Sequence, residues 1–371
     1  RLTIGKFGPE GVKGMLVRYG TQVTAIDFYE NVLWQSTDGI SIFGYGVEGA
    51  WDFDGDGIDE LLGMKDQYLV LIDGATGEVE SKTPMPMNVQ FAYFANLKNS
   101  AHPMDIVLHG SDFQTRQPTL CAYDNNLNPL WKTSPILGVG HSIHVADINR
   151  DGRDEIAAGV TLVGPDGKII WTMEDWECMG FHVDAVLMGE FEGNESDGGE
   201  VAYAGEDEGG FLLLDARTGK VRRRHEVGHA QHVFVGKFRR DQPGLQIWVT
   251  NRWGSYGIWN LFSGSGDKLF TFEPDPSATE GGLPVNWTGD GEELIMVPTG
   301  PEAFGLYDGY GRKVVDLSRC LTRHSPLGHW VNKPFIPSKD LPPNYWPNDW
   351  WSNPAVPVDI VGDARDELLF A

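Results

Sequence analysis

The most constraining feature of this sequence is an internal repeat. A short apolar strand, an acidic turn containing glycine and a second apolar strand recur eight times along the chain. The clearest copies are WDFDGDGIDELLG at 51–63 and VADINRDGRDEIAAG at 145–159. The other copies are 4–19, 94–110, 188–205, 235–250, 286–298 and 358–371. Such periodicity indicates that one supersecondary unit is repeated, so the fold is built from similar modules rather than from one irregular core.

A second repeated unit lies between these copies, in which two apolar runs flank a turn around Asp or Gly. It occurs seven times, for example as LIDGATGEVE at 71–80 and LLDARTGKVR at 213–222. These turns predict β-hairpins, because glycine readily adopts the positive φ that such turns require. Together the two units give four strands in about 46 residues, which is typical of one blade of a β-propeller.

We therefore predict an all-β chain that folds as a β-propeller with four antiparallel strands per blade. Seven blades are complete in the sequence and an eighth has its first two strands, so we predict eight blades, with seven as the alternative. Residues 1–371 are expected to form one domain with almost no helix. Residues 318–357, rich in Pro, Trp and Asn, form an insertion without strand periodicity, and insertions of this length are usually functional.

The composition excludes several classes of protein. The formal net charge of −24 repels phosphate backbones and disfavours binding to nucleic acid. No apolar stretch is long enough for a membrane span. Three cysteines cannot form a disulfide framework. The chain begins at Arg1 without Met or signal peptide, which leaves secretion open. A monomer is expected.

Two acidic turns have the ligand spacing of calcium loops. Carboxylate and amide oxygens stand at positions 1, 3, 5 and 9 of each turn, and a glycine permits the sharp bend between them. The ligands are Asp52, Asp54, Asp56 and Glu60 in the first turn, and Asp147, Asn149, Asp151 and Glu155 in the second. We expect one or two structural Ca²⁺ ions; the alternative is acidic turns without an ion.

Histidines precede the first strands of several blades. His141, His182 and His229, together with Asn353, fall at similar positions before the turns, so we expect them to ring one mouth of the central channel. Imidazoles there can act as acid or base in a substrate site. The alternatives are ordinary packing residues, or zinc held by His182 together with Cys178.

Other groups are predicted at the same mouth. In the segment NRWGSYG, an arginine could bind a carboxylate and a tyrosine could exchange a proton. Aromatic side chains of the insertion could wall a carbohydrate cleft, because sugar rings stack on aromatic faces. The predicted substrate-binding residues are Asn251, Trp253, Trp330, Trp350, Trp351 and Asn353.

Three segments carry a resemblance to a known family. The sequences GHSIHVADINRDGRDEIAAG, GHAQHVFVGKFRRDQPGLQIWV and VDIVGDARDELLF resemble the repeated segments of family 11 rhamnogalacturonan lyases. The similarity is clearest over residues 138–250. It implies an eight-bladed, calcium-binding propeller that degrades polysaccharide.

Our leading hypothesis is a secreted or periplasmic polysaccharide lyase that cleaves a uronic-acid-containing glycan, such as a rhamnogalacturonan, by β-elimination. We assign Arg252 to the uronate carboxylate, His182 or His229 to the base, and Tyr256 or His141 to the acid. The partner would be an acidic polysaccharide or oligosaccharide. The alternatives are a glycoside hydrolase similar to α-rhamnosidases on the same propeller, and a non-catalytic propeller that binds glycan or protein.

Overall fold

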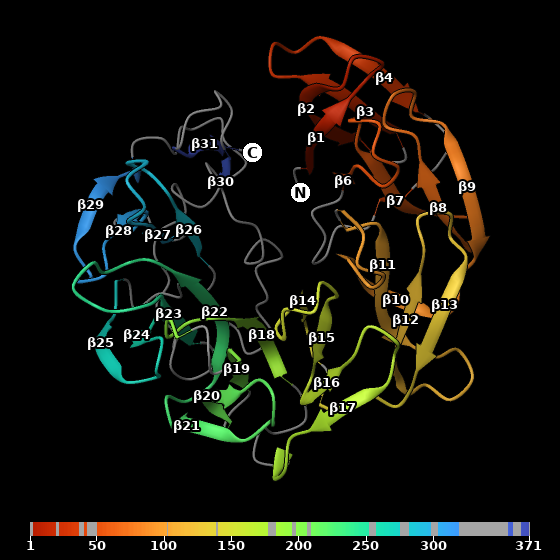
Figure 1. Cartoon of the computed structure of the whole chain (residues 1–371). Helices are drawn as coiled ribbons and strands as arrows, with labels where there is room; N and C mark the ends of the chain where they lie inside the picture. The colour runs from red at the N-terminus through yellow and green to blue at the C-terminus, as the bar shows by residue number, and fades with distance from the viewer. Residues whose placement is uncertain are drawn as a thin grey trace, which may run out of the picture. The chain divides into compact units, whose positions relative to one another are not determined.

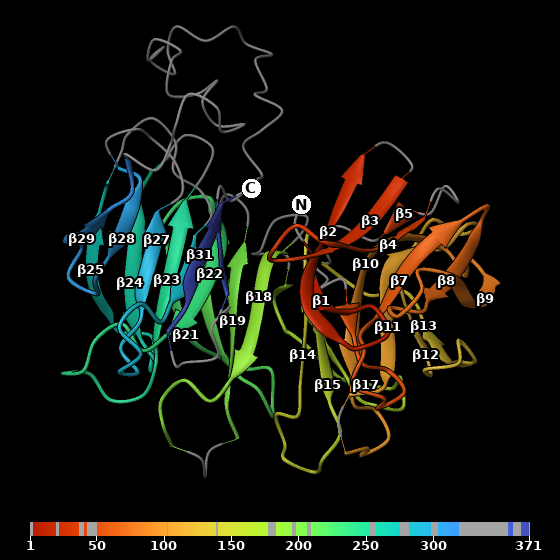
Figure 2. The same cartoon turned by 90° about the horizontal axis from the view of Figure 1, so that it is seen from above.

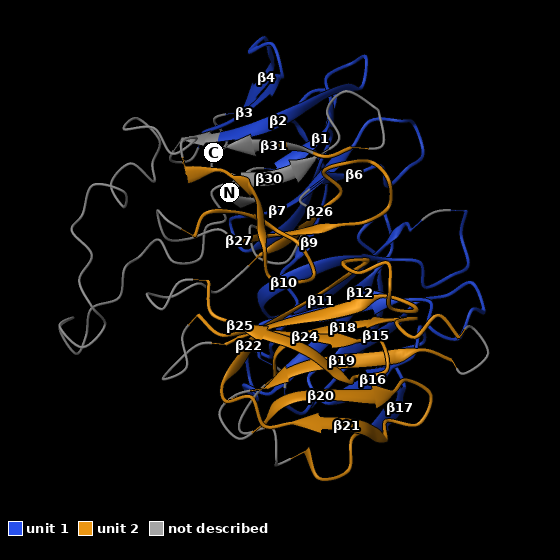
Figure 3. Cartoon of the chain, turned by 90° about the vertical axis from the view of Figure 1, so that its left-hand side faces the viewer, with its two compact units in different colours: residues 1–172 blue, residues 173–371 orange. Residues whose placement is uncertain are grey.

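The structure is a computed structural model and consists of β-strands and connecting turns. It describes residues 3–19, 22–36, 41–42, 50–101, 103–138, 140–176, 183–194, 198–205, 209–251, 257–274, 282–297, 303–318, 355–358 and 365–370. No α-helix occurs among these residues, so none of them forms a membrane-spanning helix. The chain divides into two compact units, residues 1–172 and 173–371, which Figure 3 shows in different colours. Each unit is described by itself.

Unit 1 contains four sheets (Figure 1). Its strands are β1 (Thr3–Phe7), β2 (Val12–Tyr19), β3 (Gln22–Asp27), β4 (Val32–Ser36), β5 (Ser41–Ile42), β6 (Ala50–Trp51), β7 (Glu60–Lys65), β8 (Tyr68–Ile72), β9 (Val79–Pro84), β10 (Asn88–Ala95), β11 (Asp105–Ser111), β12 (Pro118–Tyr123), β13 (Pro129–Thr133), β14 (Ile143–Ala146), β15 (Glu155–Ala158), β16 (Thr161–Val163) and β17 (Ile169–Thr172). The short strands β5 and β6 pair with successive parts of β7, so together they take the place of one first strand.

Unit 2 contains three sheets of four strands and one of two, counted over its described residues. Its strands are β18 (Val183–Gly189), β19 (Glu200–Gly205), β20 (Gly210–Asp215), β21 (Val221–His225), β22 (Ala230–Gly236), β23 (Gln246–Asn251), β24 (Trp259–Ser263), β25 (Lys268–Phe272), β26 (Leu283–Val285), β27 (Leu294–Val297), β28 (Gly305–Tyr307), β29 (Lys313–Asp316), β30 (Ala355–Val358) and β31 (Glu367–Phe370). Figure 2 shows β23, β24, β27 and β28 lengthwise.

The sheets have the organisation of propeller blades. In each four-stranded sheet the strands pair in chain order and antiparallel, and the first strands of successive sheets contact one another, β10 with β14 in unit 1 and β18 with β22 in unit 2. The repeat predicted from the sequence therefore corresponds to the sheets, and the prediction of an all-β propeller fold is confirmed. Among the described residues, seven sheets are complete and the eighth has the two strands β30 and β31; the number of blades in a closed ring stays a prediction.

The hydrophobic core lies between successive sheets. Apolar side chains of β2, β3, β7 and β8 pack between the first two sheets, and similar clusters separate the other sheets within each unit. In unit 2, for example, Phe211 packs against Phe262 of the next sheet with ring centroids 4.5 Å apart. Burial of both faces explains why the middle strands of most sheets, such as β19 and β20, read as apolar runs, whereas β3 in the first sheet alternates between buried and half-buried residues.

The hairpin between the third and fourth strands is similar in all seven complete sheets. A register shift lies near its turn, as between Leu71 and Ile72 or between Leu213 and Leu214. Asp73 and Asp215 accept hydrogen bonds from turn residues in two of these hairpins. The positive φ expected of the turn glycines is confirmed at Gly77.

Glycine at position 77 also has a packing role that the sequence did not reveal. A Cβ at this position would lie 2.5 Å from the ring of Trp34, which belongs to the preceding sheet. The Trp34 indole N–H donates to the carbonyl of Gly74 at 2.7 Å. Trp131 donates in the same way to Pro165, with Gly167 beneath its ring. In both cases a tryptophan on the outer strand of one sheet donates a hydrogen bond to the hairpin of the next sheet and packs on its glycine.

The first repeated turn carries a second connection between sheets. The Asp59 carboxylate accepts the backbone N–H of Lys6 at 2.8 Å, and the Asp59 N–H donates to the Lys6 carbonyl at 2.9 Å. Asp154 and Asn96 form the same reciprocal pair. In both acidic turns, the acid before the buried glutamate therefore connects the turn to the preceding sheet.

Strand β30 begins at Ala355, so the last three residues of the predicted insertion belong to a strand. The rest of the insertion after Ser318 lies outside the described residues. The division into two units falls between β17 and β18, that is, between two sheets rather than within one. The expectation of a single domain stays a prediction.

Candidate functional site

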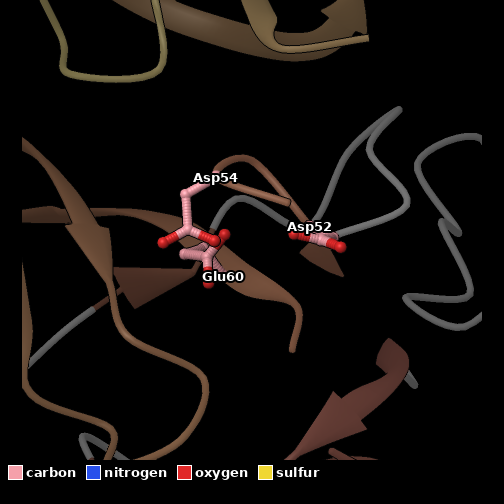
Figure 4. Close-up of side chains that lie close together, drawn as sticks. All are labelled: Asp52, Asp54 and Glu60. Atoms are coloured by element: carbon pink, nitrogen blue, oxygen red, sulfur yellow. The ribbon is translucent and has the colours of Figure 1, made fainter. Parts of the chain in front are cut away.

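The first acidic turn brings three carboxylates together between β6 and β7. One oxygen of each of Asp52, Asp54 and Glu60 lies within 4.8 Å of the others (Figure 4). The turn is shaped by its own side chains, since the two Asp52 oxygens accept the N–H groups of Gly55 at 2.7 Å and Gly57 at 3.0 Å. Both glycines have positive φ, which explains their place in the motif.

Glu60 is the group in this turn that most needs a cation. It is 4% exposed and accepts the backbone N–H of Phe53 at 2.7 Å. Burial, aided by the charges of Asp54, Asp56 and Glu80, raises the pKa of Glu60 to about 8. Among the described residues, no Lys or Arg forms an ion pair with a carboxylate of this turn. Calcium requires six to eight oxygen ligands, and this donor set fits it. Asp56 lies outside the three-residue cluster, and its carboxylate accepts the Ile58 N–H at 2.8 Å.

The second acidic turn, between β14 and β15, satisfies its acids differently. Asp147 accepts the N–H of Gly152 at 2.8 Å, as Asp52 does with Gly57. The Asn149 amide donates to Glu155 at 2.6 Å, and the Arg153 guanidinium lies 2.9 Å from the carboxylate of Asp151. These four predicted ligands do not form a cluster of three acids of the kind found in the first turn, within the part of the chain that the structure describes.

A buried acid–histidine pair joins two neighbouring sheets of unit 2. His229 directly precedes β22, and its Nε2 lies 3.0 Å from Oδ2 of Asp184 on β18. The side chains are 5% and 2% exposed. Asp184 is an extra residue in its strand, because the register of β18 with β19 shifts between Val183 and Ala185. Such bulges re-aim side chains and are common beside functional sites.

The chemistry of this pair follows from its donors. A carboxylate can only accept, so the proximity of Asp184 favours a proton on Nε2 of His229. The neutral imidazole then has its basic lone pair on Nδ1. Asn251, which is fully buried, donates its amide to the carbonyl of Val227, two residues before His229. The segment that leads to His229 is thus fixed by a residue predicted to bind substrate; substrate contact by Asn251 stays a prediction.

The remaining predicted residues divide into two groups. His141 is exposed and precedes β14 in unit 1, whereas His229 lies in unit 2, so their convergence at one mouth stays a prediction. The others lie outside the described residues: His182, Arg252, Tyr256, Trp253, Trp330, Trp350, Trp351, Asn353 and Cys178. The zinc alternative therefore stays untested as well.

Sequence reasoning missed two residues of these sites. Asp184 follows His182 by two positions, and only the bulge directs it toward His229. Glu80 lies on the outer strand β9, about 20 residues after Glu60, and no loop motif contains it. The only sign of Glu80 in the sequence was that the same sheet carries acids in both of its repeated units, the acidic turn before β7 and the hairpin between β8 and β9.

Comparison with known proteins relates residues 122–371 to a known family. The model of the C-terminal domain of rhamnogalacturonan lyase family 11 matches residues 122–371. The rhamnogalacturonan exolyase YesX of Bacillus subtilis is 28% identical over 244 residues, which cover 62% of this chain and 34% of YesX. The rhamnogalacturonan endolyase YesW of the same organism is 26% identical over 262 residues, which cover 67% of this chain and 35% of YesW. The chain thus spans about a third of the length of these relatives.

Solved structures agree in fold. The family 11 rhamnogalacturonan lyase of Bacillus licheniformis superposes with a TM-score of 0.59 at 19% identity, covering 80% of this chain and 60% of that chain. At this identity the superposition supports the fold alone. Because the family model covers well over half of the sequence, the chain belongs to rhamnogalacturonan lyase family 11.

Proposed function

We propose that this chain is the propeller part of a secreted or periplasmic polysaccharide lyase that cleaves rhamnogalacturonan by β-elimination. The family match over residues 122–371 is the observation that carries this proposal. The two curated relatives support it, since both are named for lyase action on rhamnogalacturonan. One is an exolyase and the other an endolyase. The size of the products must therefore be measured to distinguish cleavage at the chain ends from cleavage within the polysaccharide.

In β-elimination a base removes the proton from the carbon beside the uronate carboxylate. The electron pair of that C–H bond forms a carbon–carbon double bond while the bond to the leaving glycosidic oxygen breaks, and an acid gives that oxygen a proton. A cation or hydrogen-bond donor on the carboxylate stabilises the negative charge that develops. We assign the carboxylate to Arg252, the base to His182 or His229, and the acid to Tyr256 or His141.

The buried pair supports His229 as the base and gives Asp184 a positioning role. When Nε2, which lies at ion-pair distance from Asp184, carries the proton of the neutral imidazole, Nδ1 is the nitrogen that would take the substrate proton. The imidazolium formed in that step would be stabilised by the Asp184 carboxylate 3.0 Å away. This is the logic by which a carboxylate orients a catalytic histidine in many enzymes.

We also propose that calcium binds the turn formed by Asp52, Asp54 and Glu60. The buried Glu60 carboxylate and the oxygens within 4.8 Å of one another support this site. When bound, the ion would supply the positive charge that the turn itself lacks, and the turn would then connect β6 and β7 more rigidly. The turn of Asp147 offers fewer available ligands, because the Asn149 amide already donates to Glu155 and Arg153 already pairs with Asp151.

The test of catalysis is an assay on rhamnogalacturonan with calcium present, followed by the ultraviolet absorbance of the unsaturated uronate product. We expect His229→Ala to lower turnover about 100-fold or more. Because this change removes the imidazole beside the buried Asp184 carboxylate, the melting temperature should fall as well, so turnover is compared at a temperature at which both proteins are folded. Asp184→Asn should lower turnover less and displace the acid limb of the pH–rate profile, which a purely structural residue would not do. Activity should fall as pH drops through the pKa of the base, because imidazolium cannot accept a proton.

Several outcomes would contradict the proposal. Reducing sugar released without the new absorbance would indicate a glycoside hydrolase, and binding of the polysaccharide without either product would indicate a non-catalytic propeller. His144→Ala is the matched control, because this histidine is partly buried on β14 of unit 1 and is expected to act through stability. Full activity of a variant lacking both His182 and His229 would remove these residues from the mechanism.

A further inference from the structure

A buried glutamate recurs in a sheet of unit 2 that has no DxDxDG turn. Glu200 begins β19, as Glu60 begins β7, and it is fully buried. The backbone N–H of Phe191 donates to Glu200 at 2.8 Å, as Phe53 donates to Glu60 at 2.7 Å. The two sheets thus hold an equivalent carboxylate in the same way, and each must compensate its charge.

In unit 2 the compensating charge comes from an arginine. The guanidinium of Arg222 lies 2.7 Å from Glu200, 2.8 Å from Asp215 and 3.7 Å from Glu192. Glu192 follows Phe191 as Asp54 follows Phe53, and Asp215 opens the outer hairpin as Asp73 does. One guanidinium therefore meets three carboxylates that have counterparts around the proposed calcium turn.

The strand register identifies the residue that Arg222 replaces. Val221 pairs with Leu214 at the start of β21, and Val79 pairs with Ile72 at the start of β9. The next residues, Arg222 and Glu80, therefore occupy the same place in their sheets. Partial burial and the nearby charges of Asp54, Asp73 and Asp56 raise the pKa of Glu80.

We propose that Arg222 is a built-in cation that does in the β18–β21 sheet what a bound calcium ion does in the β5–β9 sheet. The charge at this one outer-strand position, negative in Glu80 and positive in Arg222, then decides whether a sheet depends on the metal. In a third sheet a cation also compensates the buried acid, but it comes from the turn before β11 and not from the outer strand: Asp105 at the start of β11 is 1% exposed and lies 2.9 Å from the ammonium of Lys98.

This inference rests on the proposed calcium site and not on the lyase reaction, so thermal unfolding tests it. Arg222→Glu leaves an additional acid among three others. In chelator we expect the melting temperature of this variant to fall by about 5–10 °C relative to the unsubstituted protein. Millimolar calcium should restore most of that loss, because the ion can now occupy the place of the guanidinium. If Arg222→Glu folds only when calcium is present, that result would likewise show that its stability depends on the ion.

The reciprocal change is Glu80→Arg. Since Glu80 is exposed, this variant should fold, and calorimetric titration should show calcium binding to the turn weakened about tenfold or more. Arg223→Gln is the matched control: Arg223 is the next residue on β21, is half exposed and lies 3.7 Å from the exposed Asp267. Its melting temperature should change by about 2 °C or less, with or without calcium.

The outcomes separate the two proposals. An Arg222→Glu variant whose melting temperature ignores calcium would overturn the inference, as would unchanged calcium binding by Glu80→Arg. If the unsubstituted protein takes up no calcium, the proposed site at Asp52, Asp54 and Glu60 fails. Recovery of Arg222→Glu by calcium would even then support the role of Arg222, since that response comes from the other unit.

Discussion

His109 should make the protein unusually sensitive to mild acid. It lies on β11 and is 2% exposed, with its ring stacked on Phe91 at a centroid distance of 5.7 Å. Among the described residues, no group forms a hydrogen bond with its Nδ1. Burial lowers the pKa of His109 from 6.5 to about 4, and no neighbouring charge contributes to that shift. The folded protein therefore holds this imidazole in its neutral form.

The direction and size of the effect follow from proton linkage. Above pH 6.5 the imidazole is neutral in the folded and unfolded chain, so it adds no pH dependence. As the pH falls below 6.5 the unfolded chain binds a proton first, and the free energy of unfolding decreases until the pH approaches 4. A difference of that size between the two pKa values corresponds to about 3 kcal/mol.

The variant His109→Leu isolates this contribution. It keeps the side-chain volume and removes the titrating group. At neutral pH, the lost ring stacking and the removed unsatisfied nitrogen should cancel to within about 1 kcal/mol. Urea unfolding between neutral pH and pH 4 should then show the variant gaining about 3 kcal/mol relative to the unsubstituted protein. His144, which is also buried with a pKa lowered to about 4, remains in both proteins and cancels.

Thr119→Val is the control for this experiment. Thr119 is buried on the neighbouring strand β12, and its hydroxyl donates to the Gln117 carbonyl at 2.9 Å. Its loss should cost about 1 kcal/mol at every pH, because the group does not titrate. The contrary result would be a free energy of unfolding that decreases with falling pH equally in His109→Leu and in the unsubstituted protein. His109 would then have to bind its proton in the folded state as readily as in the unfolded chain, and the argument from burial would be wrong.

Three further predictions concern the metal, the sheet contacts and the insertion. Chelation should lower the melting temperature by several degrees in scanning calorimetry, and the absence of any shift would contradict the calcium site. Gly77→Ala should destabilise by about 2–4 kcal/mol in urea, because it combines a positive φ with a clash against Trp34, whereas Gly291→Ala, with a similar φ and open space around its Cβ, should cost about 1–2 kcal/mol. Replacing Trp350 and Trp351 with Ala should weaken binding of the polysaccharide, measured by calorimetry, with little change in stability; a collapse in stability would instead indicate core residues.

The sheet organisation could be predicted from the sequence because two simple signals repeat. Apolar runs give the strands, and turns such as DGATGE give the hairpins, so every predicted copy corresponds to strands of the structure. Bulges were not predictable in this way. The extra residue at Asp184 leaves the apolar pattern of β18 unchanged, and its effect appears only in the pairing with β19.

The candidate site was only partly predictable, because motifs describe one loop at a time. The spacing of Asp52, Asp54 and Glu60 within one turn indicated a cation, and the structure brings these oxygens together. Nothing in that spacing shows that Glu80 on another strand adds charge to the turn. Likewise the three arginines after Val221 look like one basic run, yet Arg222 is paired with the buried Glu200 while Arg223 is half exposed.

The adjacent acids at the end of the first turn connect metal binding with sheet packing. Asp59 bonds to the backbone of Lys6 in the preceding sheet, whereas Glu60, the next residue, belongs to the carboxylate cluster. Since one peptide unit joins them, a cation that fixes Glu60 also fixes the carboxylate that holds β1. Asp154 and Glu155 repeat this arrangement toward Asn96. The DE pair of the motif thus contacts two sheets at once, so the proposed ion, if it binds this exposed turn, would also stabilise the packing of the neighbouring sheet.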